Sequence, residues 1–228
     1  MDLLEAMEKR HSVREYTDKK IEGEIKEELK SFIGECNRES GLKMQLILNE
    51  EEAFKSGIFA KFGIFKNVKN YIAIVARKCP YTDTDTGFYG EKVVLKATQL
   101  GLNTCWVAMT YDKNKVNVEI NDDEKLVIVI AIGYGENEGK AHKSKTINKL
   151  AKFKGEMPDW FERGLKAAQL APTAMNQQRF KFNLLSDGVV RAETSFGFYT
   201  KIDLGIAKYH FEIGADYSSD TKEWVWKY

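Results

Sequence analysis

Two short polar segments near opposite ends of the chain carry residue types that could bind a charged heterocycle. Residues 10–14 (Arg-His-Ser-Val-Arg) offer two guanidinium groups and a hydroxyl, which suit a phosphate and the electron-rich edge of a ring. Residues 171–178 (Ala-Pro-Thr-Ala-Met-Asn-Gln-Gln) offer a hydroxyl and three carboxamides, which suit a heterocycle that alternates N–H and C=O groups. Neither segment is decisive alone, but together they indicate flavin mononucleotide (FMN).

The composition sets a broad frame for these segments. The 228 residues carry a formal net charge of +1, which gives no global field for nucleic acid or a membrane surface, and we expect neither as a partner. The first ten residues are typical of an amphipathic helix and not of a signal peptide, and no window is apolar enough to span a bilayer. Three irregularly spaced cysteines favour reduced thiols in a cytoplasmic protein, and the three scattered histidines do not indicate a metal site.

Apolar periodicity and terminating glycines predict the elements that must position the two segments. Residues 54–65, rich in Phe and Gly, are ambiguous between a helix and a loop. A polar stretch over residues 81–86 is expected to lead into the third helix, which Gly101 ends. The pattern predicts helices over residues 2–9, 22–36, 88–100, 159–170 and 201–213 (ended by Gly214), and strands over residues 43–48, 70–76, 104–109, 125–132 and 180–185.

The second half of the chain repeats part of the order of the first. In both halves a helix, a connecting segment, a strand and a glycine-terminated helix follow one another. The sequences that run from the helix into the strand align weakly between the two halves. Any two amphipathic helices that lead into strands would show some of this similarity. We therefore expect an internal duplication, with halves at about residues 1–150 and 155–228 within one domain of residues 1–228.

Five blocks of the sequence together resemble the nitroreductase family of FMN-dependent oxidoreductases. They are RHSVREY (10–16), GLNTCWV (101–107), IAIGYGE (130–136), HKSKTINKL (142–150) and APTAMNQQ (171–178). The first and last are fairly specific as a pair, while the other three are weak alone. The resemblance implies an α+β fold, with a central, mostly antiparallel sheet flanked by helices.

The order of the blocks departs from the usual plan of that family. Members are commonly homodimers with the flavin at the subunit interface, and the segment like residues 171–178 usually follows the arginine-rich segment by one helix. Here that place holds residues 34–40 (Gly-Glu-Cys-Asn-Arg-Glu-Ser), which lack it, and no such arginine-rich segment precedes Asp159. The chain thus resembles a divergent branch in which one chain imitates the dimer. This implies a monomer that binds one FMN.

The resemblance also implies roles for individual residues of the first half. Arg10 and Ser12, together with the intervening His11, would hold the ribityl phosphate, and Arg14 would lie at the N1–C2=O edge of the ring. The backbone that follows the helix at residues 88–100 would pass the N5 and O4 atoms of the flavin, and it comprises Trp106, Val107, Ala108 and Met109.

Further roles are implied for residues of the second half. Lys143 and Lys145 match the place where the family puts a second basic pair on the phosphate. Pro172, Thr173, Asn176 and Gln178 would line the ring or its dimethylbenzene side. The family often continues with Pro-Trp after the last of these residues, whereas this chain has Arg179-Phe180, so the ring contacts on that side are less secure.

Simpler interpretations remain open for each of these features. Residues 10–14 could be an exposed basic turn, residues 171–178 a polar helix end, and the lysines a solvated pair. Cys105 fits a packed apolar residue better than a nucleophile, since no histidine lies near it in the sequence. The glycines at 133, 135 and 139 do not have the G-x-G-x-x-G spacing, so a Rossmann site is excluded.

The resemblance implies that NADH or NADPH reduces FMN by hydride transfer and leaves. A small electron-poor acceptor, such as a nitroaromatic compound or a quinone, would then take the electrons in a ping-pong cycle. No residue is assigned as catalytic, because no protein general acid is evident. Two alternatives stay open: a dehydrogenase or dehalogenase reaction on the same fold, and a non-catalytic or regulatory FMN-binding protein.

Overall fold

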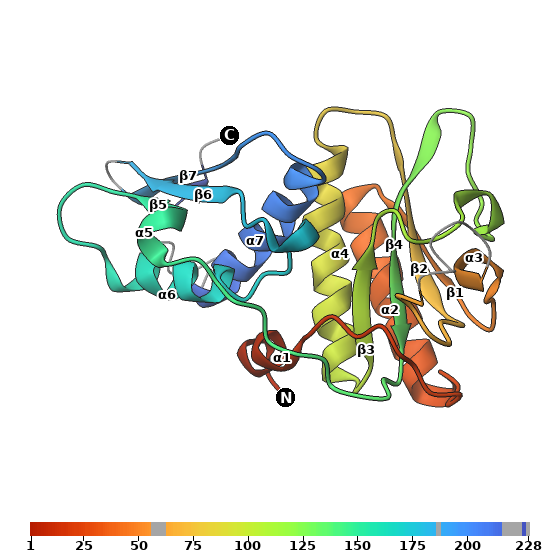
Figure 1. Ribbon diagram of the computed structural model, residues 1–228. Helices are drawn as coiled ribbons and strands as arrows, with labels where there is room; N and C mark the ends of the chain where they lie inside the picture. Colours follow the sequence, from red (N-terminus) through yellow and green to blue (C-terminus); the bar gives the residue numbers. More distant parts are fainter. Residues whose placement is uncertain (56–62, 186–187, 216–224, 227–228) are drawn as a thin grey trace. The chain divides into compact units, whose positions relative to one another are not determined.

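The computed structural model describes residues 1–55, 63–185, 188–215 and 225–226 (Figure 1). The helices are α1 (Leu3–Lys9), α2 (Gly23–Ser40), α3 (Glu52–Lys55), α4 (Thr82–Gln99), α5 (Ile147–Leu150), α6 (Asp159–Ala168) and α7 (Thr200–Gly214). The strands are β1 (Lys43–Ile47), β2 (Tyr71–Arg77), β3 (Asn103–Val107), β4 (Glu124–Gly133), β5 (Ala151–Lys152), β6 (Phe180–Leu184), β7 (Val189–Thr194) and β8 (Val225–Trp226). The expected α+β fold is confirmed. Within the described residues, no helix has the length and apolar character needed to cross a membrane.

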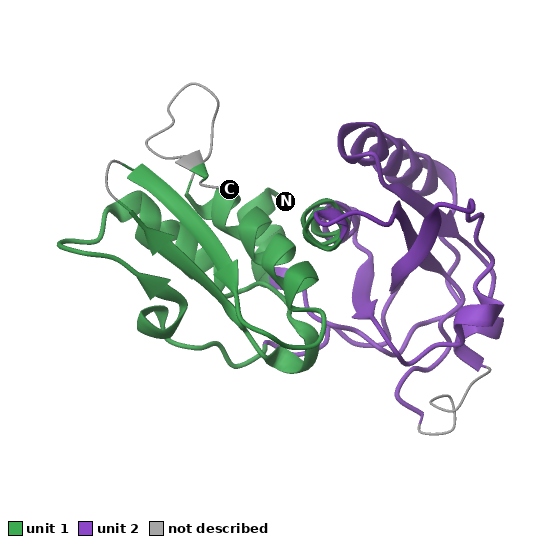
Figure 2. Cartoon of the chain, turned by 90° about the horizontal axis from the view of Figure 1, so that it is seen from above, with its two compact units in different colours: residues 1–8, 83–91, 142–228 green, residues 9–82, 92–141 purple. Residues whose placement is uncertain are grey.

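The chain divides into two compact units (Figure 2). Unit 1 comprises residues 1–8, 83–91 and 142–228, and unit 2 comprises residues 9–82 and 92–141. Helix α4 therefore contributes its first part to unit 1 and its last part to unit 2. The halves at about residues 1–150 and 155–228 were expected from sequence similarity, whereas these units are defined by compactness. The internal duplication therefore remains a prediction.

Unit 2 is built on an antiparallel sheet with the strand order β1-β2-β4-β3. The two central strands are almost continuous runs of aliphatic residues, and the side chains from Tyr71 to Ala76 and from Ile128 to Ile132 are buried. This is the mostly antiparallel sheet that the resemblance implies. Because β3 is an edge strand, one of its sides is open to pairing with another segment.

Two helices of unit 2 are joined by ion pairs. Lys92 and Lys96 of α4 contact Glu39 and Glu28 of α2, at 2.6 and 2.5 Å. Gly101 follows α4 with a φ of 77°, and the N–H of Leu102 bonds back into the last turn. The predicted end of this helix is thus confirmed.

Unit 1 contains a second, mixed sheet that the sequence analysis did not predict. Its order is β5-β6-β7-β8, with β6 and β7 antiparallel and the two outer pairs parallel. Phe182 of β6 stacks on Phe211 of α7 at 4.6 Å between ring centroids, and Phe161 of α6 meets the same ring at 5.6 Å. Helix α7 therefore packs on the aromatic side chains of this sheet, and α6 packs on α7.

Helices α4 and α7 approach each other at a reciprocal glycine contact. A Cβ atom on Gly87 would lie 2.0 Å from the carbonyl oxygen of Ile202, and one on Gly205 would lie 2.0 Å from that of Thr84. Each glycine thus meets the carbonyl three residues before the other glycine. Helix α4 begins at Thr82, so residues 82–86, which we expected to precede the helix, form its first part.

Helix α7 ends at Gly214, as expected, but Gly214 does not adopt a left-handed terminating conformation. A Cβ there would lie 2.4 Å from the Cβ of Ala167 and 2.6 Å from the carbonyl of Arg163, so this glycine lets α7 approach α6. Residues 56–62 of the ambiguous segment lie outside the described residues.

Candidate functional site

In unit 2, the segment over residues 10–14 lies along the open side of β3. The N–H of Val13 donates to the carbonyl of Thr104 at 3.0 Å, and Ser12 forms a parallel bridge with Thr104. Val13 and Thr104 are both buried. The sheet edge therefore fixes the backbone of the arginine-rich segment directly after α1 ends.

The two arginines of this segment differ in environment. Arg10 is only 5% exposed, whereas Arg14 is exposed. Burial raises the pKa of the neighbouring Cys105 thiol, while Arg14, a hydrogen bond from Ser12 and Arg10 act in the opposite direction. The thiol is therefore held protonated and packs as a small side chain.

The residues that flank this segment come from two further parts of unit 2. The Nδ1 atom of His11 lies 2.8 Å from the carbonyl of Arg10, and Gly139, with a φ of 70°, packs against the Cβ of His11. Trp106 and Val107 end β3 opposite Ile130 and Val129 of β4. Ala108 and Met109 continue from the strand, and the side chain of Met109 is exposed.

In unit 1, the loop over residues 172–178 has an unusual backbone. It follows α6 and contains a 3₁₀ turn over Ala174–Asn176. Met175, Asn176 and Gln178 have φ values of 52°, 53° and 46°, in the left-handed region that favours glycine. Each such residue costs about 1 kcal/mol, so this conformation persists only because its surroundings impose it.

The side chain of Gln178 provides part of that constraint. It is 3% exposed, and its Nε2 donates to the carbonyl of Lys143 at 2.9 Å and to Oδ1 of Asn176 at 2.6 Å. Its Oε1 accepts the N–H of Lys145 at 2.7 Å. Both amide protons of Gln178 are therefore used inside the protein, where they shape the loop.

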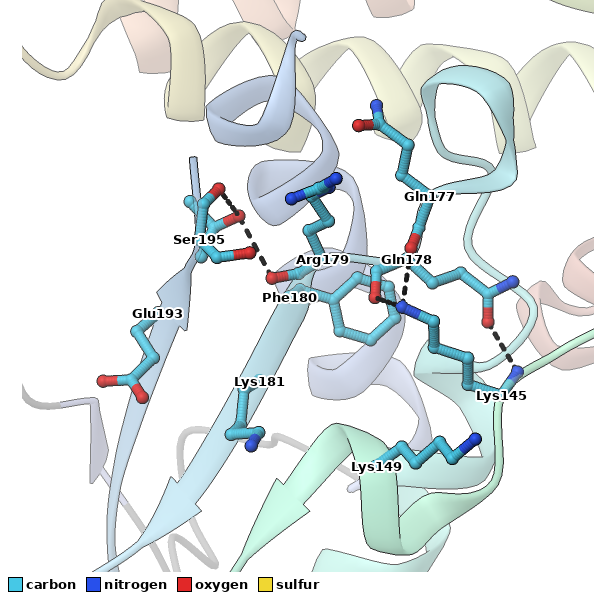
Figure 3. A pocket seen from close by; sticks show the side chains of 10 residues that line it. Lys145, Lys149, Gln177, Gln178, Arg179, Phe180, Lys181, Glu193 and Ser195 are labelled. Carbon is cyan, nitrogen blue, oxygen red and sulfur yellow. Dashed lines mark hydrogen bonds between the residues drawn. The ribbon is translucent and has the colours of Figure 1, made fainter. Parts of the chain in front are cut away.

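Lys145, Asn176 and Thr173 provide further constraints on the loop. The Nζ atom of Lys145 donates to the carbonyls of Gln177 and Gln178 at 2.7 and 2.9 Å (Figure 3). The Nδ2 atom of Asn176 donates to the carbonyl of Lys143 at 3.0 Å, and Oγ1 of Thr173 accepts the N–H of Gln178 at 3.1 Å. The structure therefore brings the predicted residues at 143, 145, 173, 176 and 178 together around one loop.

One buried carboxylate that the sequence analysis missed also holds this loop. Asp203, in the first turn of α7, is 3% exposed, and its Oδ1 accepts the N–H of Ala174 at 2.9 Å. Its Oδ2 is buried without a hydrogen-bond partner among the residues that the structure describes. No local pattern in the sequence marks Asp203, because the contact joins residues that are far apart along the chain.

A polar cavity of about 530 Å³ opens beside the same loop (Figure 3). Four cationic side chains and one carboxylate line it, together with amides and hydroxyls. The lining residues are Lys145, Lys149, Gln177, Gln178, Arg179, Phe180, Lys181, Glu193, Thr194 and Ser195. Only Lys145 and Gln178 among them were predicted as site residues, although Lys149 and Gln177 lie within the blocks at residues 142–150 and 171–178.

The predicted site residues thus form two sets, each described within its own unit. The set in unit 2 comprises Arg10, His11, Ser12, Arg14, Trp106, Val107, Ala108 and Met109. The set in unit 1 comprises Lys143, Lys145, Pro172, Thr173, Asn176 and Gln178. Across the described residues, no three His, Cys, Asp or Glu side chains gather in a way that could hold a metal ion.

Solved structures with similar folds support the topology. A protein from Thermotoga maritima described as a "putative nitroreductase" is 23% identical over 94% of this chain and 83% of its own, with a TM-score of 0.67. An FMN- and NADPH-dependent nitroreductase from Sphigopyxis sp. strain HMH is 15% identical over 68% of this chain and all of its own, with a TM-score of 0.55. A nitroreductase family protein from Streptococcus pneumoniae is 16% identical over 65% of this chain and 98% of its own, with a TM-score of 0.52. At these identities, the similarity establishes the fold.

No curated protein matches the sequence of this chain. A family model described as "Putative TM nitroreductase" matches residues 2–215, nearly the whole chain. The chain therefore belongs to this nitroreductase family, a family of oxidoreductases.

Proposed function

We propose that this protein is an FMN-dependent oxidoreductase that uses NADH or NADPH to reduce small electron-poor organic compounds such as nitroaromatics or quinones. The observation that carries the proposal is the loop over residues 172–178. Three non-glycine residues there are held in a strained backbone by bonds from Lys145, Gln178 and Asp203. Strain of this kind gathers at ligand-binding sites, where a preformed backbone lowers the entropic cost of binding.

The chemistry of the two residue sets fits FMN. Arg10 and Ser12 lie on the backbone that β3 fixes, and in this proposal they hold the phosphate, with Lys143 and Lys145 supplying further positive charge. The position of His11 between them supports a contact through its backbone. A phosphate dianion would bind the guanidinium of Arg10 through charge-assisted hydrogen bonds.

The ring side of the proposed site uses both sets. Arg14 is exposed, and a fixed positive charge at the N1–C2=O edge favours the reduced ring. Backbone groups of residues 106–109, together with Pro172, Thr173 and Asn176, would line the ring. Gln178 would serve the cofactor through the shape of the loop, because its amide protons are already donated.

When bound, FMN would accept a hydride from the nicotinamide and pass electrons to the acceptor. The chain would supply position and charge, and no residue of the chain is assigned a proton-transfer role. We place the protein in the cytoplasm as part of this proposal, which three cysteines outside any disulfide support.

We further propose that the chain is a monomer with one FMN, in which two fused halves each supply one side of the site. The order helix, strand, strand, helix, strand occurs as α6-β6-β7-α7-β8, and it also occurs as α2-β1-β2-α4-β3 when the short helix α3 between β1 and β2 is left out. The reciprocal contact of Gly87 and Gly205 has the form expected of a two-fold interface, in which each side makes the same contact.

Reduction of the FMN-loaded protein tests the catalytic part of the proposal. Under anaerobic conditions, NADH or NADPH should bleach the visible flavin band within seconds, and a nitroaromatic compound or a quinone should restore it. A flavin that only dithionite bleaches would contradict this proposal and would favour a protein that holds FMN without turnover.

A further inference from the structure

We propose that the cationic cavity of unit 1 binds a phosphate group of the nicotinamide dinucleotide, through Lys149, Arg179 and Lys181. This inference rests on the proposed function and deepens it, because it names the part of the reductant that the protein recognises. The cavity volume of about 530 Å³ lies within the range that is usual for small-molecule sites.

The charges that line the cavity favour an anion. Lys145, Lys149, Arg179 and Lys181 supply four cations, and Glu193 is the one carboxylate in the lining. Glu193 already pairs with Arg191 outside the cavity, at 3.6 Å. The cavity therefore keeps a net positive charge that a phosphate would neutralise.

Two of these cations are available to a ligand. Among residues 1–55, 63–185, 188–215 and 225–226, the ammonium groups of Lys149 and Lys181 have neither an ion pair nor a hydrogen bond. Lys145, by contrast, spends two of its three N–H donors on the loop. We therefore assign the phosphate to Lys149 and Lys181, with Arg179 beside them.

An aromatic residue at the edge of the cavity favours a nucleotide over a simple anion. Phe196 directly follows Ser195, which lines the cavity, and its carbonyl accepts a bond from Nη1 of Arg179 at 2.8 Å. Its side chain is 97% exposed. An exposed aromatic ring next to a cluster of cations suits a nucleotide, because a base can stack on the ring while the cations hold the phosphate.

NADH and NADPH share the pyrophosphate, and NADPH adds a 2′-phosphate. Both are phosphate groups attached to an adenosine ribose, so the chemistry of the cavity alone fits either. A reductant without any phosphate, N-benzyl-1,4-dihydronicotinamide, carries the same reactive ring. Comparison of the three reductants therefore separates phosphate recognition from hydride transfer.

The test measures flavin bleaching in the FMN-loaded protein as a function of the concentration of each reductant. The variant is Lys149→Gln/Lys181→Gln, and the matched control is Lys152→Gln/Lys154→Gln, which removes two exposed lysines of the same unit that do not line the cavity. We expect the half-saturating concentration of NADPH to rise about ten-fold in the first variant, with no change in the control.

The three reductants distinguish the outcomes. If the half-saturating concentration rises for NADPH alone, the cavity binds the 2′-phosphate. If it rises equally for NADPH and NADH, the cavity binds the pyrophosphate. The benzyl compound should react equally with all variants in either case. The inference would be overturned if the half-saturating concentrations of both dinucleotides were unchanged in the Lys149→Gln/Lys181→Gln variant. It would also be overturned if the benzyl compound showed the same rise as the dinucleotides.

A binding measurement keeps this inference separate from the proposed function. Calorimetric titration with adenosine 2′,5′-bisphosphate needs no flavin, and we expect binding to the original chain and to the control but at least ten-fold weaker binding to the first variant. If no reductant bleaches the flavin, the proposed function fails while this titration still decides whether the cavity binds phosphate. Equal binding to all three proteins would overturn the inference.

Discussion

The carboxylate of Asp203 accepts the backbone N–H of Ala174 at 2.9 Å. This bond joins the first turn of α7 to the loop that starts at Pro172. Ala174 directly precedes Met175, the first of the three residues of the loop with a left-handed backbone, so the bond acts where the strain of the loop begins. We regard Asp203 as a positioning residue for the proposed flavin site.

Substitution of Asp203 separates its role as an acceptor from its charge. Asp203→Asn keeps an oxygen that can accept the N–H of Ala174, whereas Asp203→Leu leaves that N–H without its partner. We expect about ten-fold weaker FMN binding for the leucine variant, since a buried hydrogen bond of this kind is worth about 1–3 kcal/mol. The asparagine variant should bind FMN nearly as well as the original chain, as measured by flavin fluorescence titration. Equal losses in both variants would contradict an acceptor role.

The stability of the protein should depend on pH through the same residue. Burial raises the pKa of Asp203 from 3.8 to about 7, and the N–H of Ala174 opposes this rise. The folded chain thus binds a proton that the unfolded chain has lost, so this stabilisation is complete below about pH 4 and is lost as the pH rises through 7.

Urea unfolding of the original chain and of Asp203→Asn at pH 4 and pH 8 measures this effect. The free energy of unfolding of the original chain should fall, relative to the variant, by roughly 4 kcal/mol between the two pH values. A difference between the two proteins that does not change with pH would show that Asp203 does not titrate in this range.

Substitution of Gly205 tests the close approach of α4 and α7. Gly205→Ala places a Cβ 2.0 Å from the carbonyl of Thr84, so the helices must separate, and we expect a loss of about 3 kcal/mol or more in the free energy of unfolding. Gly34→Ala in α2 is the matched control, because its Cβ meets only the end of the Arg38 side chain, at 3.6 Å. The control should gain up to about 1 kcal/mol from helix propensity. Similar effects in both variants would contradict the close contact.

A fully buried pair of side chains joins α4 and α7 as well. The Nε2 atom of His210 lies 2.9 Å from Oε1 of Glu91, and its Nδ1 lies 3.2 Å from the carbonyl of Ala167. Glu91→Ala removes one partner and leaves the imidazole buried, which should cost about 3–5 kcal/mol. Glu39→Ala, which breaks an exposed ion pair with Lys92, should cost at most about 1 kcal/mol. Thermal unfolding of the two variants checks the difference, and equal costs would contradict a buried pair.

The sequence predicted best where structure depends on local pattern. The bounds of β2 and β4 were predicted to within a few residues from their aliphatic runs, and the end of α4 was predicted from the glycine that follows it. Strand β7 was missed, because polar residues predominate after Val189 and Val190, although the preceding Asp-Gly pair is a hairpin signal. The early start of α4 was also missed, because residues 81–86 are polar apart from Tyr81 and show no apolar periodicity.

The candidate site divides in the same way. Residues 143–145 and 172–178 were found from motifs, and the structure brings them into one hydrogen-bonded loop. Lys145 and Gln178 were predicted as ligands, yet most of their polar groups hold that loop in shape. Asp203 and Lys181 lie outside the five blocks, and Lys149 lies within residues 142–150 but was assigned no role, since the role of each depends on elements that meet only in the folded chain.

The number of FMN molecules per chain tests the central claim most directly. Purified protein, loaded with FMN and freed of excess, would be denatured, and the released flavin would be quantified against protein, with the mass of the native particle measured by light scattering. We expect one FMN for each chain and a particle with the mass of a single chain. A protein that takes up no FMN would contradict the assignment to flavin chemistry, and two FMN for each chain would contradict the fused composite site.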